Sequence, residues 1–197
     1  MKKIVLLLLA VGFAWGLKAQ SDFSFGPKVG LNFTNISNTD ANNKTSIHAG
    51  IFASAQLTEW VGMQVEFLYS RQGVADKYKE NGATVKLKGR VNYLNLPVLA
   101  KVNLYKNVTF DLGPQFGFAL NAKAKTKSGG TVVKEKLHDL NFFDLSFALG
   151  VSYEPDSRLV MSARYYLGIT NVFDADAFGS NNKNRVFQLS LGYKLAS

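Results

Sequence analysis

Seven charged residues stand in the small, polar phase of segments that otherwise alternate between apolar and polar residues: Lys28, Glu66, Lys101, Asp111, Asp144, Arg164 and Lys194. Charges withdrawn from water are stable only when they have partners of opposite sign, and here three acids can pair with four bases. We therefore expect a structural ion-pair network around Glu66, Lys101, Asp111, Asp144 and Arg164, which fills an enclosed space.

Residue types that support catalysis or metal binding are scarce. The chain has no cysteine and two histidines, so neither a zinc site nor a thiol nucleophile is expected. We expect His48 to be structural. The adjacent pair His138-Asp139 leaves open an enzyme site, although a base, an acid and a nucleophile are all required. No phosphate-binding glycine loop is present. The prediction is a protein without cofactor, metal or enzymatic activity.

Lysines gather in two segments between the alternating stretches, and three of them are Lys123, Lys125 and Lys127. They could be an ordinary solvated surface. They could also contact phosphate groups of a ligand through charge-assisted hydrogen bonds. The formal net charge is +9, but we do not expect nucleic acid as a partner of an exported protein.

Strict alternation of apolar and polar residues returns eight times and predicts eight β-strands. The expected strands span 23–34, 46–57, 61–70, 93–102, 108–120, 143–153, 159–170 and 187–195. Their apolar phase is bulky and aromatic, whereas the other phase is small and glycine-rich. This pattern predicts an all-β fold, an eight-stranded antiparallel up-and-down transmembrane barrel with lipid outside. A soluble lipocalin-like barrel is the alternative, but its outer strand faces would carry more charge.

Short turns and long polar connections also alternate along the chain. This alternation is typical of short periplasmic turns and longer outer loops. Asn81-Gly82 and Ser128-Gly129-Gly130 predict hairpins that carry the third to sixth strands beyond the membrane. The apolar phase is odd at Val85, Leu87 and Val91 but even at Leu94, which predicts a β-bulge near Val91–Tyr93.

The first 19 residues resemble a cleaved signal peptide, with Lys2 and Lys3 before a 12-residue apolar run from Ile4 to Trp15. A transmembrane anchor is the alternative, but this run is too short to span a bilayer. We therefore divide the chain into a signal peptide, 1–19, and a barrel domain, 20–197. The predicted location is the outer membrane of a Gram-negative bacterium.

Several stretches resemble PorT-type, "porin family" outer-membrane barrels, which share the general architecture of OmpX and OmpA. They are Phe25–Asn32, Tyr93–Pro97, Leu112–Gly117, Arg164–Ile169 and Leu191–Leu195. The resemblance implies fold and location, and it implies neither a cofactor nor agreed catalytic residues. Asn95 departs from the glutamate that the family often has there, and the C-terminus does not end on an aromatic residue.

The combined prediction is a barrel with a plugged lumen and a structural or interaction role through its outer loops. A narrow passive porin is the alternative, followed by a rim-located enzyme. The expected partners are outer-membrane lipid, lipopolysaccharide and an unidentified protein at the loops.

Overall fold

The computed structural model describes residues 23–36, 44–73, 75–80, 83–128, 131–136, 141–155, 158–172 and 183–195. The predicted signal peptide and the pair His138-Asp139 lie outside the described residues. The described residues include no helix long and apolar enough to cross a membrane.

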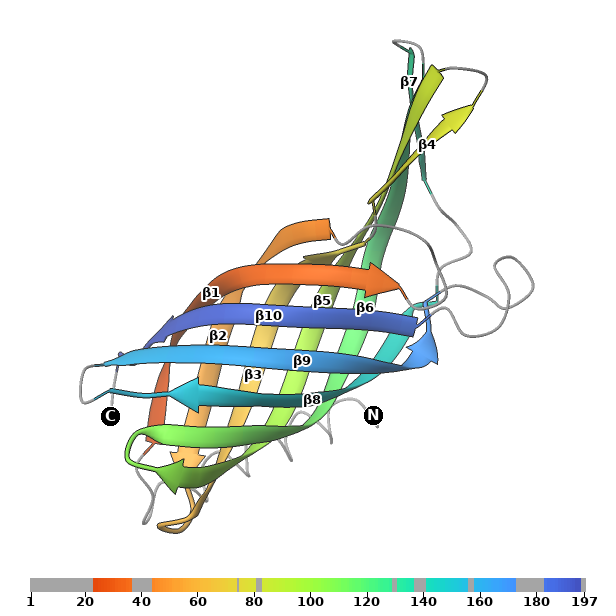
Figure 1. Ribbon diagram of the computed structural model, residues 1–197. Coiled ribbons are helices and arrows are strands. Elements are labelled where there is room, and N and C mark those ends of the chain that lie inside the picture. Colours follow the sequence, from red (N-terminus) through yellow and green to blue (C-terminus); the bar gives the residue numbers. More distant parts are fainter. Residues whose placement is uncertain are drawn as a thin grey trace, which may run out of the picture.

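All described elements are antiparallel strands, and eight of them form a closed ring (Figure 1). The strands of the ring are β1 (Phe23–Ile36), β2 (Lys44–Gln56), β3 (Val61–Gln72), β5 (Ala83–Tyr105), β6 (Val108–Ser128), β8 (Phe143–Tyr153), β9 (Leu159–Asn171) and β10 (Lys183–Tyr193). Each strand pairs with its neighbours, and the pairings β1–β10 and β5–β6 leave the ring without a free edge. The predicted eight-stranded up-and-down barrel is therefore confirmed.

The two phases of the strands have opposite environments. Large apolar side chains such as Ile51, Phe67 and Leu191 are exposed on the outside of the ring. Polar side chains such as Gln64 and Gln188 are buried inside it. This arrangement inverts that of a water-soluble protein, and it follows the predicted phase along every strand of the ring.

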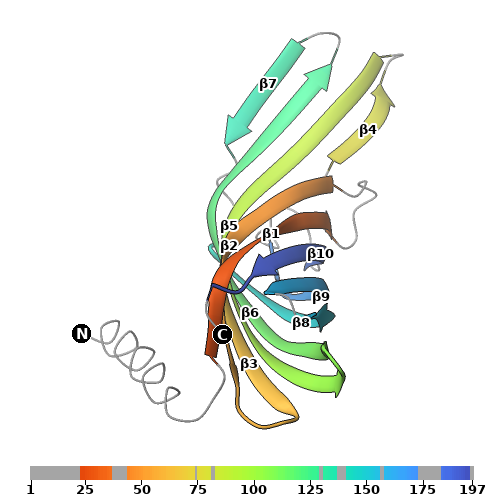
Figure 2. The same ribbon diagram turned by 90° about the vertical axis from the view of Figure 1, so that its left-hand side faces the viewer.

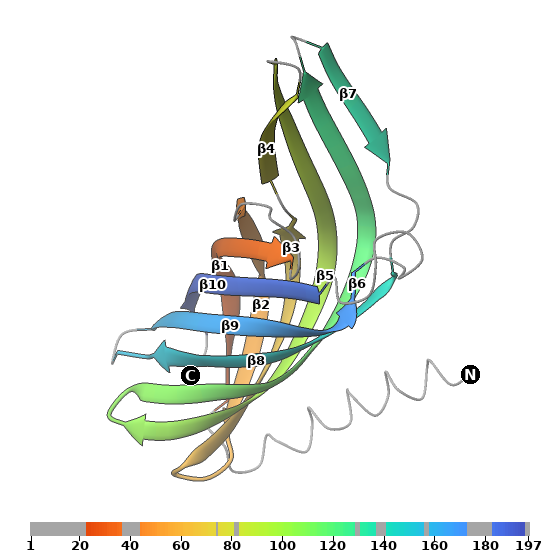
Figure 3. The same ribbon diagram turned by 45° about the vertical axis from the view of Figure 1, so that its right-hand side comes forward.

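Two further strands, β4 (Ala75–Glu80) and β7 (Thr131–Lys136), stand beyond the ring. β4 pairs with residues 83–88 of β5, and β7 pairs with residues 123–128 of β6. Figures 2 and 3 show β4, β5, β6 and β7 side by side at one end of the barrel. We call this part the strand extension: β4 and β7 with residues 83–91 of β5 and 122–128 of β6. The predicted hairpins are confirmed, although most of their turn residues lie outside the described residues.

The predicted break near Val91–Tyr93 exists, but its cause differs from the expected one. The β5–β6 ladder shifts register between Asn92 and Tyr93, which pair with Asn121 and Ala119. The extra residue is therefore Leu120 of β6. β5 keeps one register against β3 and β4. A bulge in β5 was the wrong expectation, because the odd positions Val91 and Tyr93 are both buried and β5 keeps its odd positions inward throughout, although its apolar residues change from odd to even positions.

The other end of the barrel has short connections between β2 and β3, between β5 and β6, and between β8 and β9. We call it the short-turn end. Lys106 and Asn107 alone join β5 to β6, and Asn107 has a φ of 63°, a left-handed conformation that asparagine tolerates in tight turns. The backbone N–H of Glu154 donates to the carbonyl of Asn107, which ties two of these turns together.

Candidate functional site

Arg164 of β9 lies at the centre of the lumen between two carboxylates. Its Nη1 is 2.5 Å from Oε1 of Glu66, and its Nη2 is 2.8 Å from Oδ2 of Asp111. Asp111 also accepts a hydrogen bond from the hydroxyl of Ser152. These three charged side chains come from β9, β3 and β6 and are almost fully buried. One cation therefore links strands from opposite parts of the ring.

A second cation and an amide also contact Glu66, at the same carboxylate oxygen. Lys28 of β1 places its Nζ 2.7 Å from the same Oε1, and Gln64 donates its amide to that oxygen. Lys28 pairs in register with Gly50 of β2, the strand that separates β1 from β3. Because Gly50 has no side chain, Lys28 can reach across β2 to a carboxylate on β3.

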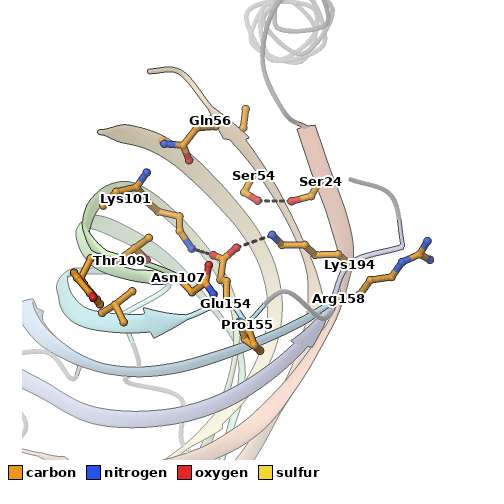
Figure 4. Close-up of a pocket in the computed structure, with 15 residues that line it drawn as sticks. Ser24, Ser54, Gln56, Lys101, Asn107, Thr109, Glu154, Pro155, Arg158 and Lys194 are labelled. Atoms are coloured by element: carbon orange, nitrogen blue, oxygen red, sulfur yellow. Dashed lines mark hydrogen bonds and ion pairs between the residues drawn. The ribbon is translucent and has the colours of Figure 1, made fainter. Parts of the chain in front are cut away.

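The network continues to the short-turn end through Lys101 of β5. Lys101 lies 3.9 Å from Asp111, donates to Gln64 and pairs with Glu154, which follows β8. Lys194 pairs with the other oxygen of Glu154 at 2.7 Å. Figure 4 shows Glu154 between the two ammonium groups. Seven alternating charges thus connect the centre of the lumen with its short-turn end.

An open cavity of about 610 Å³ lies around these last three charges. Its polar lining includes Ser24 and Ser54, whose hydroxyls are 2.8 Å apart (Figure 4). Burial alone would raise the pKa of Glu154, but the ammonium groups of Lys101 and Lys194 outweigh it. They hold the pKa of this carboxyl below its ordinary value.

A glycine makes room for the central arginine. Gly150 of β8 pairs in register with Arg164. A Cβ at Gly150 would lie 2.4 Å from the carbonyl oxygen of Ala163 and 2.5 Å from Cγ of Arg164. The small residues of the polar phase therefore leave the space that the long charged side chains occupy.

The structure brings together four of the five residues of the predicted network: Glu66, Lys101, Asp111 and Arg164. Asp144 does not join them. Its carboxylate accepts hydrogen bonds from Asn184 and from Thr170, nearer the end of the barrel that carries the strand extension. The expectation that Asp144 shares the network is therefore wrong, because no cation reaches its position among the described residues.

The prediction counted Lys28 and Lys194 among the charges of the polar phase, but it did not name them or Glu154 in the network. Glu154 follows a strand and gives no such signal. His48 is buried, and its two ring nitrogens lie 2.7 Å from Oδ1 of Asn32 and 2.9 Å from Oγ of Ser190. These contacts agree with a structural histidine.

The second group of charges lies on the strand extension and has the opposite organisation. Arg90 pairs in register with Lys123, and Lys88 pairs with Lys125. Lys127 follows at the next outward position of β6. All five side chains are exposed. We call them the cation ladder: Lys88, Arg90, Lys123, Lys125 and Lys127. Within the described part of the chain, none of the five pairs with a carboxylate.

No group of three or more histidine, cysteine or acidic residues that could hold a metal ion occurs among the described residues. The geometry of the described residues therefore offers two candidate sites. One is an ion-paired lumen and the other is an exposed cationic surface.

Several solved barrels are similar in structure. Ail of Yersinia pestis is 13% identical over 89% of this chain and 99% of its own, with a TM-score of 0.48. CarO of Acinetobacter baumannii is 11% identical over 85% and 96%, also with a TM-score of 0.48. Neisserial surface protein A is 16% identical over 90% and 98%, with a TM-score of 0.46.

No curated protein sequence matches the chain. The family described as "Outer membrane protein beta-barrel domain" matches residues 18–174, which include nine of the ten strands and most of the charged lumen. The inside-out ring of strands and this match agree, and the chain belongs to the outer membrane protein beta-barrel domain family.

Proposed function

We propose that this outer-membrane protein is a closed barrel without enzymatic activity, which acts through its strand extension. The observation that carries the proposal is the continuous chain of ion pairs Lys28–Glu66–Arg164–Asp111–Lys101–Glu154–Lys194. An eight-stranded barrel has an interior just wide enough for side chains. A network that links strands across this interior leaves an ion no continuous aqueous path.

Large neutral side chains in the lumen support the same proposal. Tyr93, Tyr166, Leu68 and Leu99 are almost completely buried in the lumen. A porin would instead line a water-filled channel with solvated groups. We therefore favour a plugged lumen over the narrow passive porin.

The proposed orientation places the strand extension outside the cell and the short turns in the periplasm, as in outer-membrane barrels of this architecture. It includes cleavage of the signal peptide after Ala19. The PorT-type assignment also remains a prediction within the wider family. The proposed partners are outer-membrane lipid, lipopolysaccharide phosphates at Lys123, Lys125 and Lys127, and a protein bound to the extension.

Orientation can be tested with trypsin added to intact cells. The cation ladder offers exposed cleavage sites on the extension, so we expect trypsin to cut after residues of the ladder while the remaining barrel stays embedded. Protection in intact cells, with cleavage only after the outer membrane is opened, would place the extension in the periplasm.

Closure can be tested by planar-bilayer recording on the refolded protein. We expect no steady conductance from the wild type. Arg164→Ala should produce intermittent openings, because Glu66 and Asp111 lose the cation that holds them together. Arg185→Ala removes an exposed arginine from the outward side of β10 and is the matched control. Heat-modifiable migration on a gel verifies that each variant is folded. Steady conductance from the folded wild type would support the porin and contradict closure.

A further inference from the structure

The outward side chains of the β5–β6 pair change in chemical character along the barrel axis. Two apolar pairs come first, Leu96 with Phe116 and Leu94 with Phe118. Asn92 and Asn121 follow, with an amide hydrogen bond of 2.7 Å between them. The cation pairs of the ladder lie directly above this amide pair. One continuous surface therefore passes from apolar through neutral polar to cationic.

The spacing of the ladder suits a row of anions. Successive outward residues on a strand are about 7 Å apart, and side chains directly opposite each other have Cβ atoms about 5 Å apart. Like charges at that separation repel each other and destabilise the strand pair. An anionic oxygen held between two such cations would remove the repulsion and form charge-assisted hydrogen bonds with both.

Backbone register extends this arrangement to the neighbouring strands. Lys86 stands opposite Lys127, Lys134 stands opposite Lys125, and Lys136 stands opposite Lys123. On the inward side of the extension, Lys44 of β2 donates a hydrogen bond of 2.6 Å to the carbonyl of Gly89. The backbone register therefore places further lysine positions beside the ladder.

We propose that the cation ladder binds phosphate groups of the lipid leaflet that surrounds the barrel, with one phosphate shared by Arg90 and Lys123. The proposal rests on the proposed function, because it requires the extension to lie on the outer, lipopolysaccharide side. It assigns Lys88 and Arg90 of β5 to the binding surface together with the three lysines of β6.

Position along the strand favours a lipid phosphate over a soluble polyanion. Arg90 is four residues from Leu94, so the first cation pair lies about 13 Å along the strand from the apolar surface. Strands of membrane barrels are tilted, which reduces this separation along the membrane normal. The first pair thus lies near the headgroup layer, on the face that already meets lipid.

The inward face of the same strands cannot serve this purpose. Val91, Tyr93, Ala119 and Ala122 form a buried apolar cluster there. The ladder therefore presents its charges away from the barrel axis, toward the surrounding leaflet.

The test uses the full mature chain refolded into phosphatidylcholine vesicles that contain lipid A with both phosphates. Parallel vesicles contain dephosphorylated lipid A. The measured quantity is the lipid A retained by the protein after mild detergent extraction, titrated to give an apparent Kd. Arg90→Gln/Lys123→Gln is compared with Lys106→Gln/Arg158→Gln, which removes two exposed cations at the short-turn end.

We expect the ladder variant to bind phosphorylated lipid A roughly thirtyfold more weakly than the wild type at low salt. The short-turn control should match the wild type, and dephosphorylated lipid A should not be retained. Equal retention of both lipids, or equal binding by the ladder variant, would overturn the proposal. Inorganic polyphosphate that binds the detergent-solubilised wild type as tightly as lipid A would assign the ladder to a soluble polyanion instead.

These outcomes are separable from the test of closure. The ladder variant keeps the whole lumen network, so its planar-bilayer behaviour should equal that of the wild type. A conducting wild type would contradict the closed barrel while leaving lipid A retention interpretable. Loss of phosphate preference in a non-conducting barrel would contradict the ladder alone.

Discussion

The lumen and the strand extension use the same kinds of charged residue in opposite ways. In the lumen, Arg164 lies between Glu66 and Asp111, and each buried charge of the network has a partner of opposite sign. On the extension, Arg90 and Lys123 are neighbours of like sign and are exposed. Both regions are built from antiparallel strands, but the ion pairs of Arg164 cross the lumen between strands that are not neighbours, whereas Arg90 and Lys123 lie opposite each other on paired strands.

The difference in charge pairing follows from the access of water to each region. A charge in the lumen has lost its hydration and must be matched within the protein. A charge on the extension keeps water and counterions, so unmatched neighbours lower stability only slightly. Unmatched exposed charge also remains available to a ligand. Substitution of a buried charge should therefore change stability and closure, whereas substitution of an exposed charge should change ligand binding.

The largest effect is expected from removing the central cation. Arg164→Leu leaves the carboxylates of Glu66 and Asp111 buried without their main partner, which should lower the free energy of unfolding by about 3–5 kcal/mol. Urea unfolding in lipid vesicles measures this change. Arg185→Leu, at an exposed position, should change it by no more than about 0.5 kcal/mol. Equal losses in the two variants would remove the distinction between matched and unmatched charge.

A smaller loss of stability is expected when the space beside Arg164 is filled. Gly150→Ala places a methyl group against the backbone of Ala163 and the side chain of Arg164, and such overpacking costs about 1–3 kcal/mol. Gly62→Ala is the milder control, because the nearest atoms there are Oε1 of the flexible Gln56 side chain at 3.0 Å and the carbonyl oxygen of Ala55 at 3.1 Å. Thermal midpoints in matched detergent compare the two. A Gly150→Ala protein as stable as Gly62→Ala would mean that Arg164 is loosely held.

The edge of the network should respond to pH. The pKa of Glu154 is below its ordinary value in the folded protein, so its ion pairs stabilise the fold fully above the unfolded pKa of about 4.3. This contribution is lost as pH falls further, through the folded pKa.

The matched variant Glu154→Gln isolates this contribution. We expect the wild type to be more stable than Glu154→Gln near neutral pH, and the difference to shrink as pH falls from about 5 to about 3. Urea midpoints across that range measure it, with exposed Glu59→Gln as the control. A difference that stays constant would show that Glu154 gains no net stability from Lys101 and Lys194.

The smallest effect on stability is expected on the strand extension, and it is a gain and not a loss. Lys125→Glu places an acid opposite Lys88 and should stabilise the β5–β6 pair by about 0.2–1 kcal/mol. Slower hydrogen exchange of the backbone amides in residues 86–90 would register the gain. Lys106→Glu, in the turn at the far end, should leave that exchange unchanged. Faster exchange in Lys125→Glu would indicate that the ladder is not under like-charge repulsion.

Much of this fold was predictable because side chains alternate between the two faces of a strand. This period of two can be read from neighbouring residues, without knowledge of which strands pair. The alternation through Phe23–Thr34 placed each side chain inside or outside the ring. Asn81-Gly82 predicted a hairpin because it matches the local geometry of a tight turn. The bulge was harder to place, because Val85 and Val91 of β5 are apolar although they face inward, and this imitates a change of phase.

Ion-pair partners could not be predicted in the same way, because they depend on the relative shift of several strands. Asp144 and Asp111 are both inward acids, yet only Asp111 is level with Arg164. Lys28 reaches Glu66 only because Gly50, on the intervening strand, has no side chain in the way. The ladder required the β5–β6 register, which pairs cations that are more than thirty positions apart in the sequence.

The bulge at Leu120 has a consequence for changes in chain length. Ala119 and Ala122 both point inward, so Leu120 and Asn121 occupy a space that strict alternation would give to one residue. Loss of Leu120 would restore the alternation without turning any other side chain of β6 around. An insertion or deletion elsewhere in β6 would reverse every side chain beyond it. The strand therefore has one position where its length can vary by a single codon while its lipid-facing, lumenal and cationic surfaces are all preserved.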